Sequence, residues 1–260
     1  MKNQKTPMES WLSEQLLVYY QPRVSFAETT FSHPKRVTGF EALVRVRSEG
    51  KIILPGVFLP YMTDTQKIII FKTVLNNILS VLESTPDVGS RSLTFGINIE
   101  PELISSFRIL STLRRIPKKY RKHIVLEILE SSVPDYDKFV RAARFLKRRL
   151  GFNLALDDFG SGGPSFRLIT TTLVGTVKLD TFFVPGKTPD TSIKREKIII
   201  ADVSKMLKNM GVLVVAEQIE NEKDFRLVKK HVHEGQGYMW GKPAPFEEWK
   251  EKNGLIVLKL

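Results

Sequence analysis

The chain has 260 residues, and its 40 Lys and Arg against 28 Asp and Glu give a formal net charge of +12. It contains no Cys, which excludes disulfides, Cys-ligated zinc, iron–sulfur clusters and thiol catalysis. The first residues lack the apolar core of a signal peptide, and no apolar run reaches the roughly 18–20 residues of a bilayer span. We therefore expect a cytoplasmic protein without membrane insertion, and the positive charge favours an anionic partner.

Short apolar segments alternate along the chain with longer segments of helical periodicity. The apolar segments predict strands at residues 16–20, 36–46, 93–99, 124–129, 154–157, 176–179 and 212–216. Apolar residues recur at helical spacing over residues 68–83, 137–150, 196–210 and 224–231. Such alternation is typical of βα units, and the number of units is close to that of one (β/α)8 barrel. The sequence therefore predicts an α/β fold.

Polar side chains stand at or near the ends of most of these predicted strands. They are Glu41, Asn98, Glu127, Asp157, Asp158, Lys178, Asp180 and Glu217. Any one of them can be read as a carboxylate that faces water or caps a helix. A barrel, however, brings the C-terminal ends of its strands to one face, where such groups would meet.

Carboxylates gathered at one face need cations to neutralise them. Oxygen ligands select hard divalent ions, which indicates Mg²⁺ or Mn²⁺. Asp157 could bridge two ions while Asp158 binds one of them. Two ions about 3.5–4 Å apart form the kind of site that cleaves phosphodiesters.

Seven motifs occur along the chain in a fixed order. They are EAL at residues 41–43, INIEP at 97–101, LEILES at 126–131, DDFGSG at 157–162, VKLD at 177–180, AEQIE at 216–220 and QGY at 236–238. In order and spacing they resemble the EAL family of cyclic di-GMP phosphodiesterases, from about residue 16 to residue 245. The resemblance implies a modified (β/α)8 TIM barrel in a single domain that hydrolyses cyclic di-GMP to linear pGpG with two Mg²⁺ or Mn²⁺ ions. We place this EAL-type domain at residues 16–250, an N-terminal extension or first helix at 1–15, and a C-terminal tail at 251–260.

The resemblance also implies roles for individual residues. The implied metal ligands are Glu41, Asn98, Glu127, Asp157, Asp158 and Glu217. The implied catalytic residues are Glu41, Lys178, Glu217 and Gln236. The implied substrate-binding residues are Gln21, Arg45, Lys178 and Asp180, with Glu130 and Glu220 in supporting positions. By the same resemblance, Arg45 would contact phosphate, Lys178 would contact the attacking water and the scissile phosphate, and Gln21 would lie beside a guanine.

Several positions depart from the family pattern. Gly163-Pro164 follow DDFGSG where Tyr-Ser is usual, and Gln218 replaces a Gly, so its backbone must tolerate a side chain. None of the departures removes an implied metal ligand. A homodimer is expected from the resemblance. The alternative is a catalytically inactive cyclic di-GMP receptor, or a regulator that binds protein or nucleic acid.

Two other features have alternative interpretations. The basic run at residues 114–122 has no interleaved aromatics of the kind nucleic-acid sites use, so we interpret it as a solvated surface and do not expect nucleic-acid binding. His231 and His233 could be metal ligands on one face of a strand, but we interpret them as a solvated helix end.

Overall fold

The computed structural model describes residues 14–27, 35–85, 92–129, 135–160, 165–171, 173–189, 191–253 and 257–258. The strands are β1 (Leu16–Ser25), β2 (Lys35–Ser48), β3 (Lys51–Ile53), β4 (Thr94–Ile99), β5 (Ile124–Leu129), β6 (Asn153–Phe159), β7 (Thr176–Leu179), β8 (Leu213–Ala216), β9 (Glu234–Gln236) and β10 (Val257–Leu258). The α-helices are α2 (Pro55–Phe58), α3 (Asp64–Ser84), α5 (Phe107–Arg114), α6 (Lys118–Arg121), α7 (Tyr136–Arg144), α8 (Ser165–Thr170), α9 (Ile193–Asn209), α10 (Glu222–Val228) and α11 (Phe246–Asn253). Short 3-10 turns are η1 (Leu59–Tyr61), η2 (Leu103–Ser105) and η4 (Thr181–Phe183), and η3 (Phe145–Leu150) is π-helical.

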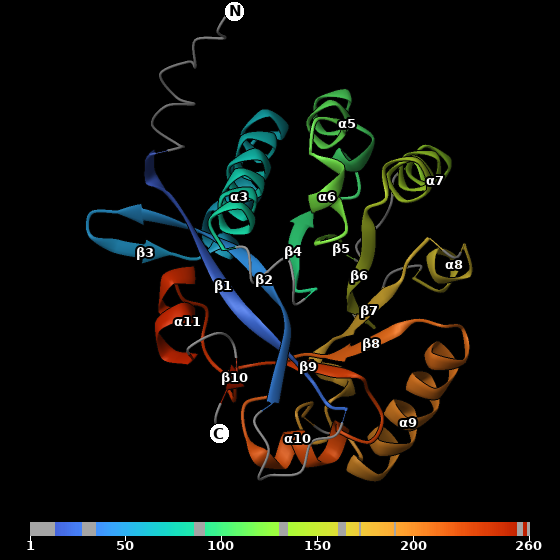
Figure 1. Ribbon diagram of the computed structural model, residues 1–260. Coiled ribbons are helices and arrows are strands. Elements are labelled where there is room, and N and C mark those ends of the chain that lie inside the picture. Colours follow the sequence, from blue (N-terminus) through green and yellow to red (C-terminus); the bar gives the residue numbers. More distant parts are fainter. Residues whose placement is uncertain are drawn as a thin grey trace, which may run out of the picture.

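The strands form a closed barrel that runs β1-β9-β8-β7-β6-β5-β4-β2 and closes where β1 pairs with β2. From β2 onward the neighbouring barrel strands are parallel, whereas β1 is antiparallel to both β2 and β9. Helices α3, α5, α7, α8 and α9 follow one another around the outside of the barrel (Figure 1). The predicted α/β class and the modified (β/α)8 barrel are confirmed, and the modification is the reversed first strand.

Two barrel strands differ from the sequence prediction because polar side chains point into the barrel. The strand predicted at residues 16–20 continues to Ser25, through the buried Gln21 and Arg23. Strand β9 was not predicted, because its three residues, Glu234 to Gln236, contain no apolar side chain. All three are nevertheless buried. Strands with polar side chains facing the barrel interior therefore cannot be recognised from apolar runs in the sequence.

The predicted helices are present with shifted ends. Helix α3 begins at Asp64, earlier than predicted, because Thr63 and Gln66 form a reciprocal capping box. Helix α10 ends at Val228, so His231 and His233 lie beyond it and the interpretation as a helix end is wrong. The Nδ1 atom of His233 instead accepts a hydrogen bond of 2.9 Å from the backbone N–H of Val214 in β8. The His233 side chain thus connects the segment after α10 to the backbone of β8.

An aromatic cluster fixes the C-terminal segment to the outside of the barrel. The ring centroid of Tyr20 lies 5.3 Å from that of Phe246 and 5.9 Å from that of Phe95. Trp249 donates a hydrogen bond of 2.7 Å from its indole N–H to the carbonyl of Tyr20. Helix α11 therefore packs on the barrel, and the boundary expected at residue 250 falls inside it. None of the helices in the described part of the chain has both the length and the apolar character that crossing a bilayer requires.

Candidate active site

The barrel strands direct several of the predicted polar side chains to one point. Side chains alternate between the two faces of a strand, so every second residue of a barrel strand faces the interior. Register places Gln21 opposite Glu41 across β1 and β2, and Asn98 beside Glu127 across β4 and β5. Glu217 directly follows β8, and its backbone N–H bonds to the carbonyl of Leu179 at the end of β7. Residues more than 170 positions apart in sequence thereby become neighbours.

Lys178 lies at the centre of this group and is 0% exposed. Its Nζ atom lies 2.8 Å from Glu217, 2.9 Å from Asp157, and 3.1 Å from Glu41 and from Glu127. One ammonium thus contacts four carboxylates. Because a single positive charge cannot neutralise four negative ones in a buried site, the arrangement retains a strong preference for further cations.

The carboxylates fall into two groups suited to metal ions. One comprises Glu41, Glu127 and Asp157; the other comprises Asp157, Asp158 and Glu217. In each group, ligand oxygens lie within 4.8 Å of one another, and Asp157 belongs to both. We call these five residues the acidic cluster. Its oxygen-only donor set and its excess negative charge fit hard divalent cations, with Asp157 in the position of a shared ligand.

Burial and mutual repulsion disturb the titration of this cluster. Burial raises the pKa of Glu127 to about 8, with further upward contributions from Glu41 and Asp157. Burial also raises the pKa of Asp158 to about 6, and the neighbouring Asp157 adds to the effect. Burial alone would lower the pKa of Lys178, but the surrounding carboxylates hold it well above its ordinary value. Without metal, these carboxyl groups therefore resist losing all their protons together, and the positive charge of Lys178 offsets only part of their negative charge.

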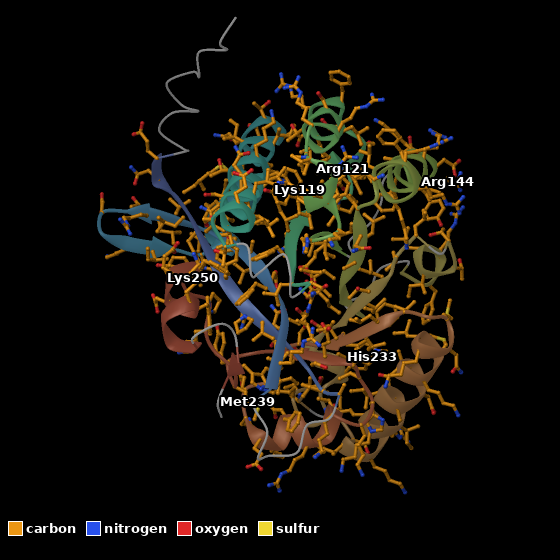
Figure 2. The ribbon with its side chains drawn as sticks, viewed as in Figure 1. Lys119, Arg121, Arg144, His233, Met239 and Lys250 are labelled. Carbon is orange, nitrogen blue, oxygen red and sulfur yellow. The ribbon has the colours of Figure 1, made fainter. Side chains whose placement is uncertain are left out.

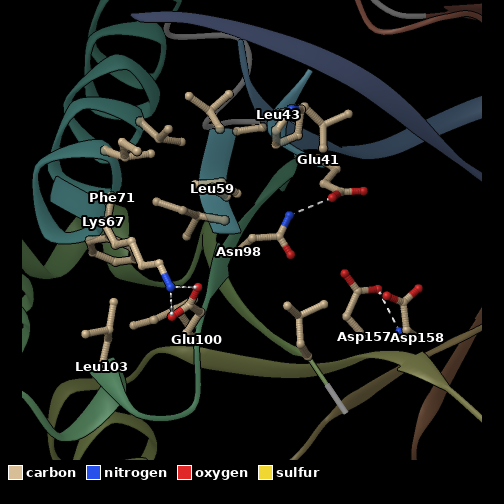
Figure 3. Close-up of a pocket in the computed structure, with 18 of the residues that line it drawn as sticks. Glu41, Leu43, Leu59, Lys67, Phe71, Asn98, Glu100, Leu103, Asp157 and Asp158 are labelled. Carbon is tan, nitrogen blue, oxygen red and sulfur yellow. Dashed lines mark hydrogen bonds and ion pairs between the residues drawn. The ribbon is translucent and has the colours of Figure 1, made fainter. Parts of the chain in front are cut away.

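Two backbone features make room for the acidic cluster. A Cβ on Gly96 would lie 2.0 Å from Oε1 of Glu127, so a glycine is required for that carboxylate to occupy its position. Asp158 has a φ of 53°, in the left-handed region that Asp tolerates better than most residues. The consecutive carboxylates of Asp157 and Asp158 are thereby presented to the same site (Figure 3).

Amide side chains surround Glu41. Asn98 donates a hydrogen bond of 2.8 Å to Oε1 of Glu41, and Gln236 donates one of 2.5 Å to Oε2. Gln236 also donates to Gln21 at 3.2 Å. These bonds, together with Lys178, lower the pKa of Glu41 against the opposing effect of burial. Gln21, Asn98 and Gln236, all predicted as site residues, therefore lie together around this carboxylate.

Three of the predicted residues have other contacts. The guanidinium of Arg45 donates to the carbonyl of Val44 at 2.8 Å and lies 5.9 Å from the ring centroid of Tyr19. Asp180 accepts a hydrogen bond of 2.9 Å from the backbone N–H of Phe182 and so caps η4. Glu220 pairs with Lys187 at 2.6 Å. Glu130 lies outside the described residues, as do Gly163 and Pro164.

Arg23 and Glu234 belong to the barrel interior and were not predicted from the sequence. Arg23 is buried, pairs with Glu234 at 2.8 Å, donates to Oγ1 of Thr94 at 2.5 Å, and lies 3.9 Å from Glu127. A signal was present in the sequence: Arg23 lies two residues after Gln21, and Glu234 two before Gln236. In a strand that spacing places both members of each pair on the same face.

Two pockets open on either side of the acidic cluster and share Glu41, Leu43 and Glu217. The first, of about 360 Å³, extends toward α3 and is lined mainly by apolar side chains, with Lys67 and Glu100 among its polar ones (Figure 3). The second, of about 300 Å³, is lined by Gln21, Gln218, Glu220, Gln236 and Tyr238 as well as the shared residues. Gln218 has a φ of 53°, so the left-handed backbone anticipated at this position is present. The site can accept a ligand that extends to both sides of the carboxylates.

Comparison with known proteins gives consistent results. The probable cyclic di-GMP phosphodiesterase PdeB of Escherichia coli K12 is 27% identical over 251 residues, which cover 92% of this chain and 45% of PdeB. The chain thus spans less than half the length of this curated relative. The structure of the EAL enzyme Bd1971 in a form bound to cAMP and cyclic di-GMP superposes with a TM-score of 0.81 at 22% identity, covering 94% of this chain and 66% of that one.

A crystal structure of an EAL domain protein from Listeria monocytogenes EGD-e superposes with a TM-score of 0.78 at 23% identity and covers 98% of this chain and all of that one. At these identities the superpositions establish the fold. The family model of the EAL domain matches residues 8–243, so the match includes the reversed β1, every barrel strand and all five residues of the acidic cluster. The chain belongs to the EAL domain family.

Proposed function

We propose that the chain hydrolyses a phosphodiester bond of cyclic di-GMP to give linear pGpG, in a reaction that requires Mg²⁺ or Mn²⁺. The observation that carries the proposal is the pair of carboxylate groups that share Asp157 between two pockets. The similarity of this chain to PdeB, a probable cyclic di-GMP phosphodiesterase, supports the choice of substrate. A cyclic dinucleotide has two bases and two phosphates, and it matches a site that extends to both sides of a cation-binding centre.

Within this proposal, Glu41, Asn98, Glu127 and Asp157 would hold one ion, and Asp157, Asp158 and Glu217 a second. Divalent ions bound there supply activation of water and stabilisation of phosphoryl charge. The oxygen of water would form a bond to phosphorus while the bond from phosphorus to the 3′ oxygen breaks. The product then carries a 5′ phosphate and a 3′ hydroxyl.

The chain's own residues would orient and stabilise the reacting groups. Lys178 stays protonated because its pKa is held well above the ordinary value, so it would act as a cation toward phosphate and not as a base. Gln236 would contact the attacking water from its place beside Glu41. Arg45 would have to turn from Val44 to contact phosphate. We also propose that the chain acts as a cytoplasmic homodimer.

The test is incubation of the purified protein with cyclic di-GMP in Mg²⁺, Mn²⁺ or Ca²⁺, or in EDTA, with the nucleotides separated by anion-exchange chromatography. Linear pGpG that forms with Mg²⁺ or Mn²⁺ and disappears with EDTA is the expected result. Tight binding without product in every metal would instead assign the chain as a cyclic di-GMP receptor. Absence of both binding and hydrolysis would overturn the proposal.

A further inference from the structure

A buried ion pair lies beside the acidic cluster in the barrel interior. It joins Arg23 on β1, which is 5% exposed, to Glu234 on β9, which is 7% exposed. Register pairs Arg23 with Gly39, two residues before Glu41 on β2, so Arg23 lies deeper in the barrel than Glu41. None of the proposed contacts to metal, water or phosphate uses this ion pair.

The guanidinium of Arg23 is held by two neighbours and stops short of a third. Its Nε atom lies 2.8 Å from Oε2 of Glu234, and its Nη2 atom donates a hydrogen bond of 2.5 Å to Oγ1 of Thr94. Its Nη1 atom lies 3.9 Å from Oε1 of Glu127. Hydrogen-bonded pairs of Arg and carboxylate measure about 2.7–2.9 Å, so a movement of about 1 Å would bring Arg23 into such a bond with Glu127.

The two carboxylate oxygens of Glu127 have different surroundings. Oε2 accepts a hydrogen bond of 3.1 Å from Lys178, whereas Oε1 is buried and accepts none from the described residues. A buried carboxylate oxygen without a donor is costly unless a cation reaches it. Because Glu127 belongs to one of the two carboxylate groups suited to metal, a divalent ion and the guanidinium of Arg23 compete for this oxygen.

The local structure favours the present position of the guanidinium. A Cβ on Gly39 would lie 2.9 Å from Nη2 of Arg23 and 2.3 Å from the carbonyl oxygen of Thr94, so the glycine makes room for the arginine beside β4. Glu234 balances the charge of Arg23, so the pair adds no net charge next to the acidic cluster. The arginine is therefore both neutralised and kept at a distance from Glu127.

We propose that Glu234 and Thr94 hold Arg23 back from Glu127 and so keep Oε1 of this carboxylate available to a divalent ion. Arg23, Thr94 and Glu234 are thus positioning residues that set the metal affinity of the site. This inference rests on the metal site of the proposed function and adds to it the residues that adjust it. The competing explanation is that the ion pair only fastens β1 to β9, and it predicts no effect on metal binding.

The test measures Mn²⁺ affinity by calorimetric titration of the metal-free protein. In Glu234→Gln the unbalanced guanidinium should close on Glu127, and the Kd for Mn²⁺ should rise by about 10- to 100-fold, as is usual when a group that orients a metal ligand is lost. The double variant Arg23→Met/Glu234→Gln removes both charges and should recover most of this affinity. Glu222→Gln is the matched control, because it breaks an exposed Arg–Glu pair with Arg226 on α10 and should retain the wild-type Kd.

Thr94→Val separates the position of the guanidinium from its charge. The change removes the acceptor of Nη2 and leaves the net charge as it is. We expect it to weaken Mn²⁺ binding in the same direction as Glu234→Gln, by a smaller factor. Circular dichroism checks that each variant is folded, and Thr94→Val decides the question if Glu234→Gln does not fold.

The outcomes separate this inference from the proposed function. A wild-type Kd in Glu234→Gln, or in Thr94→Val where the former does not fold, overturns the positioning role, and so does a double variant that binds as weakly as Glu234→Gln. Hydrolysis of cyclic di-GMP by the wild type then leaves the proposed function standing. A wild type that binds Mn²⁺ without hydrolysing cyclic di-GMP overturns the proposed hydrolysis alone, and one that binds no Mn²⁺ overturns both.

Discussion

At the scale of single residues, Lys178 has an unusual position for a lysine. Its side chain is fully buried, and its ammonium lies at the centre of four carboxylates. Desolvating a lysine is costly, and the cost is recovered only through close opposite charges. Lys178 therefore supports the folded state of the metal-free protein as well as the proposed chemistry.

Replacing this lysine should consequently destabilise the protein. We expect Lys178→Met in EDTA to lose about 3–5 kcal/mol of unfolding free energy, because the change leaves buried carboxylates without their cation. Adding Mn²⁺ should recover part of the loss, while turnover stays absent. Urea unfolding followed by circular dichroism measures both effects, with the exposed Lys205→Met on α9 as control. A loss below about 1 kcal/mol would show that the carboxylates do not depend on Lys178.

Asp157 is the residue on which both metal groups depend. We expect Asp157→Asn to lower turnover by more than about 100-fold, since changes to groups that only support a ligand already cost up to that amount. Metal added to the wild type at about 100 times its Kd should raise stability by about 2.7 kcal/mol, and the variant should lose this gain. Thermal unfolding with Mn²⁺ and with EDTA checks the prediction. Asp202→Asn, exposed on α9, should behave like the wild type; a full metal response in Asp157→Asn would contradict the shared role.

At the scale of elements, strand β4 contributes through a residue that has no side chain. Gly96 lies beside the carboxylate of Glu127 from β5, so the spacing between two neighbouring strands leaves room for a buried carboxylate only if one of them carries a glycine there. The geometry of the acidic cluster thus depends on the neighbouring strand β4 as well as on the residues that carry the carboxylates. Interiors of this density do not absorb an added methyl group without displacing something.

Gly96→Ala should therefore damage the site while it retains every ligand. The new methyl would overlap Oε1 of Glu127, and we expect the carboxylate to move, at a stability cost of about 1–3 kcal/mol. Calorimetric titration with Mn²⁺ should show weaker binding, together with reduced turnover. Gly56→Ala on α2 is the control, because a Cβ there would have no atom within 4 Å. Unchanged Mn²⁺ affinity in Gly96→Ala would contradict the prediction that the added methyl group displaces a metal-binding carboxylate.

The sequence predicted those elements whose signal is local. Apolar runs located β4, β5, β7 and β8 to within a residue or two, and the motifs identified the side chains that gather around Lys178. Strand β9 was not predicted because its inward residues, Glu234 and Gln236, are polar and its outward surface is one glycine. The orientation of Arg45 could not be predicted either. Its hydrogen bond to Val44 depends on the rotamer of the side chain, which no sequence pattern specifies.

At the scale of the whole molecule, Lys178 and Arg23 lie against the acidic cluster, but other basic side chains lie apart from it. Lys119, Arg121 and Arg144 lie on the outer helices, away from the barrel interior (Figure 2). Arg121 donates hydrogen bonds to the carbonyls of Ile116, Leu150 and Arg114, so part of this basic surface serves to fasten helix ends. Part of the +12 surplus thus lies on the outer helices, whereas the site is itself negative until it binds cations.

This separation predicts how the reaction should respond to salt. With metal bound, the surrounding positive field should steer an anionic dinucleotide to the site, and salt screens such long-range attraction over about 10 Å at 0.1 M. We expect kcat/KM to fall several-fold between about 50 and about 300 mM NaCl at saturating Mn²⁺, with kcat nearly constant, because the buried contacts at the site are screened far less. Replacing the exposed Lys118, Lys119 and Lys122 by Gln is the control, because these residues precede β5 at the end of the barrel opposite the site and should leave the salt slope and kcat unchanged. A slope that the triple replacement flattens would contradict this local origin of the steering field, and a kcat that falls in parallel with kcat/KM would mean that salt acts on the metal centre itself.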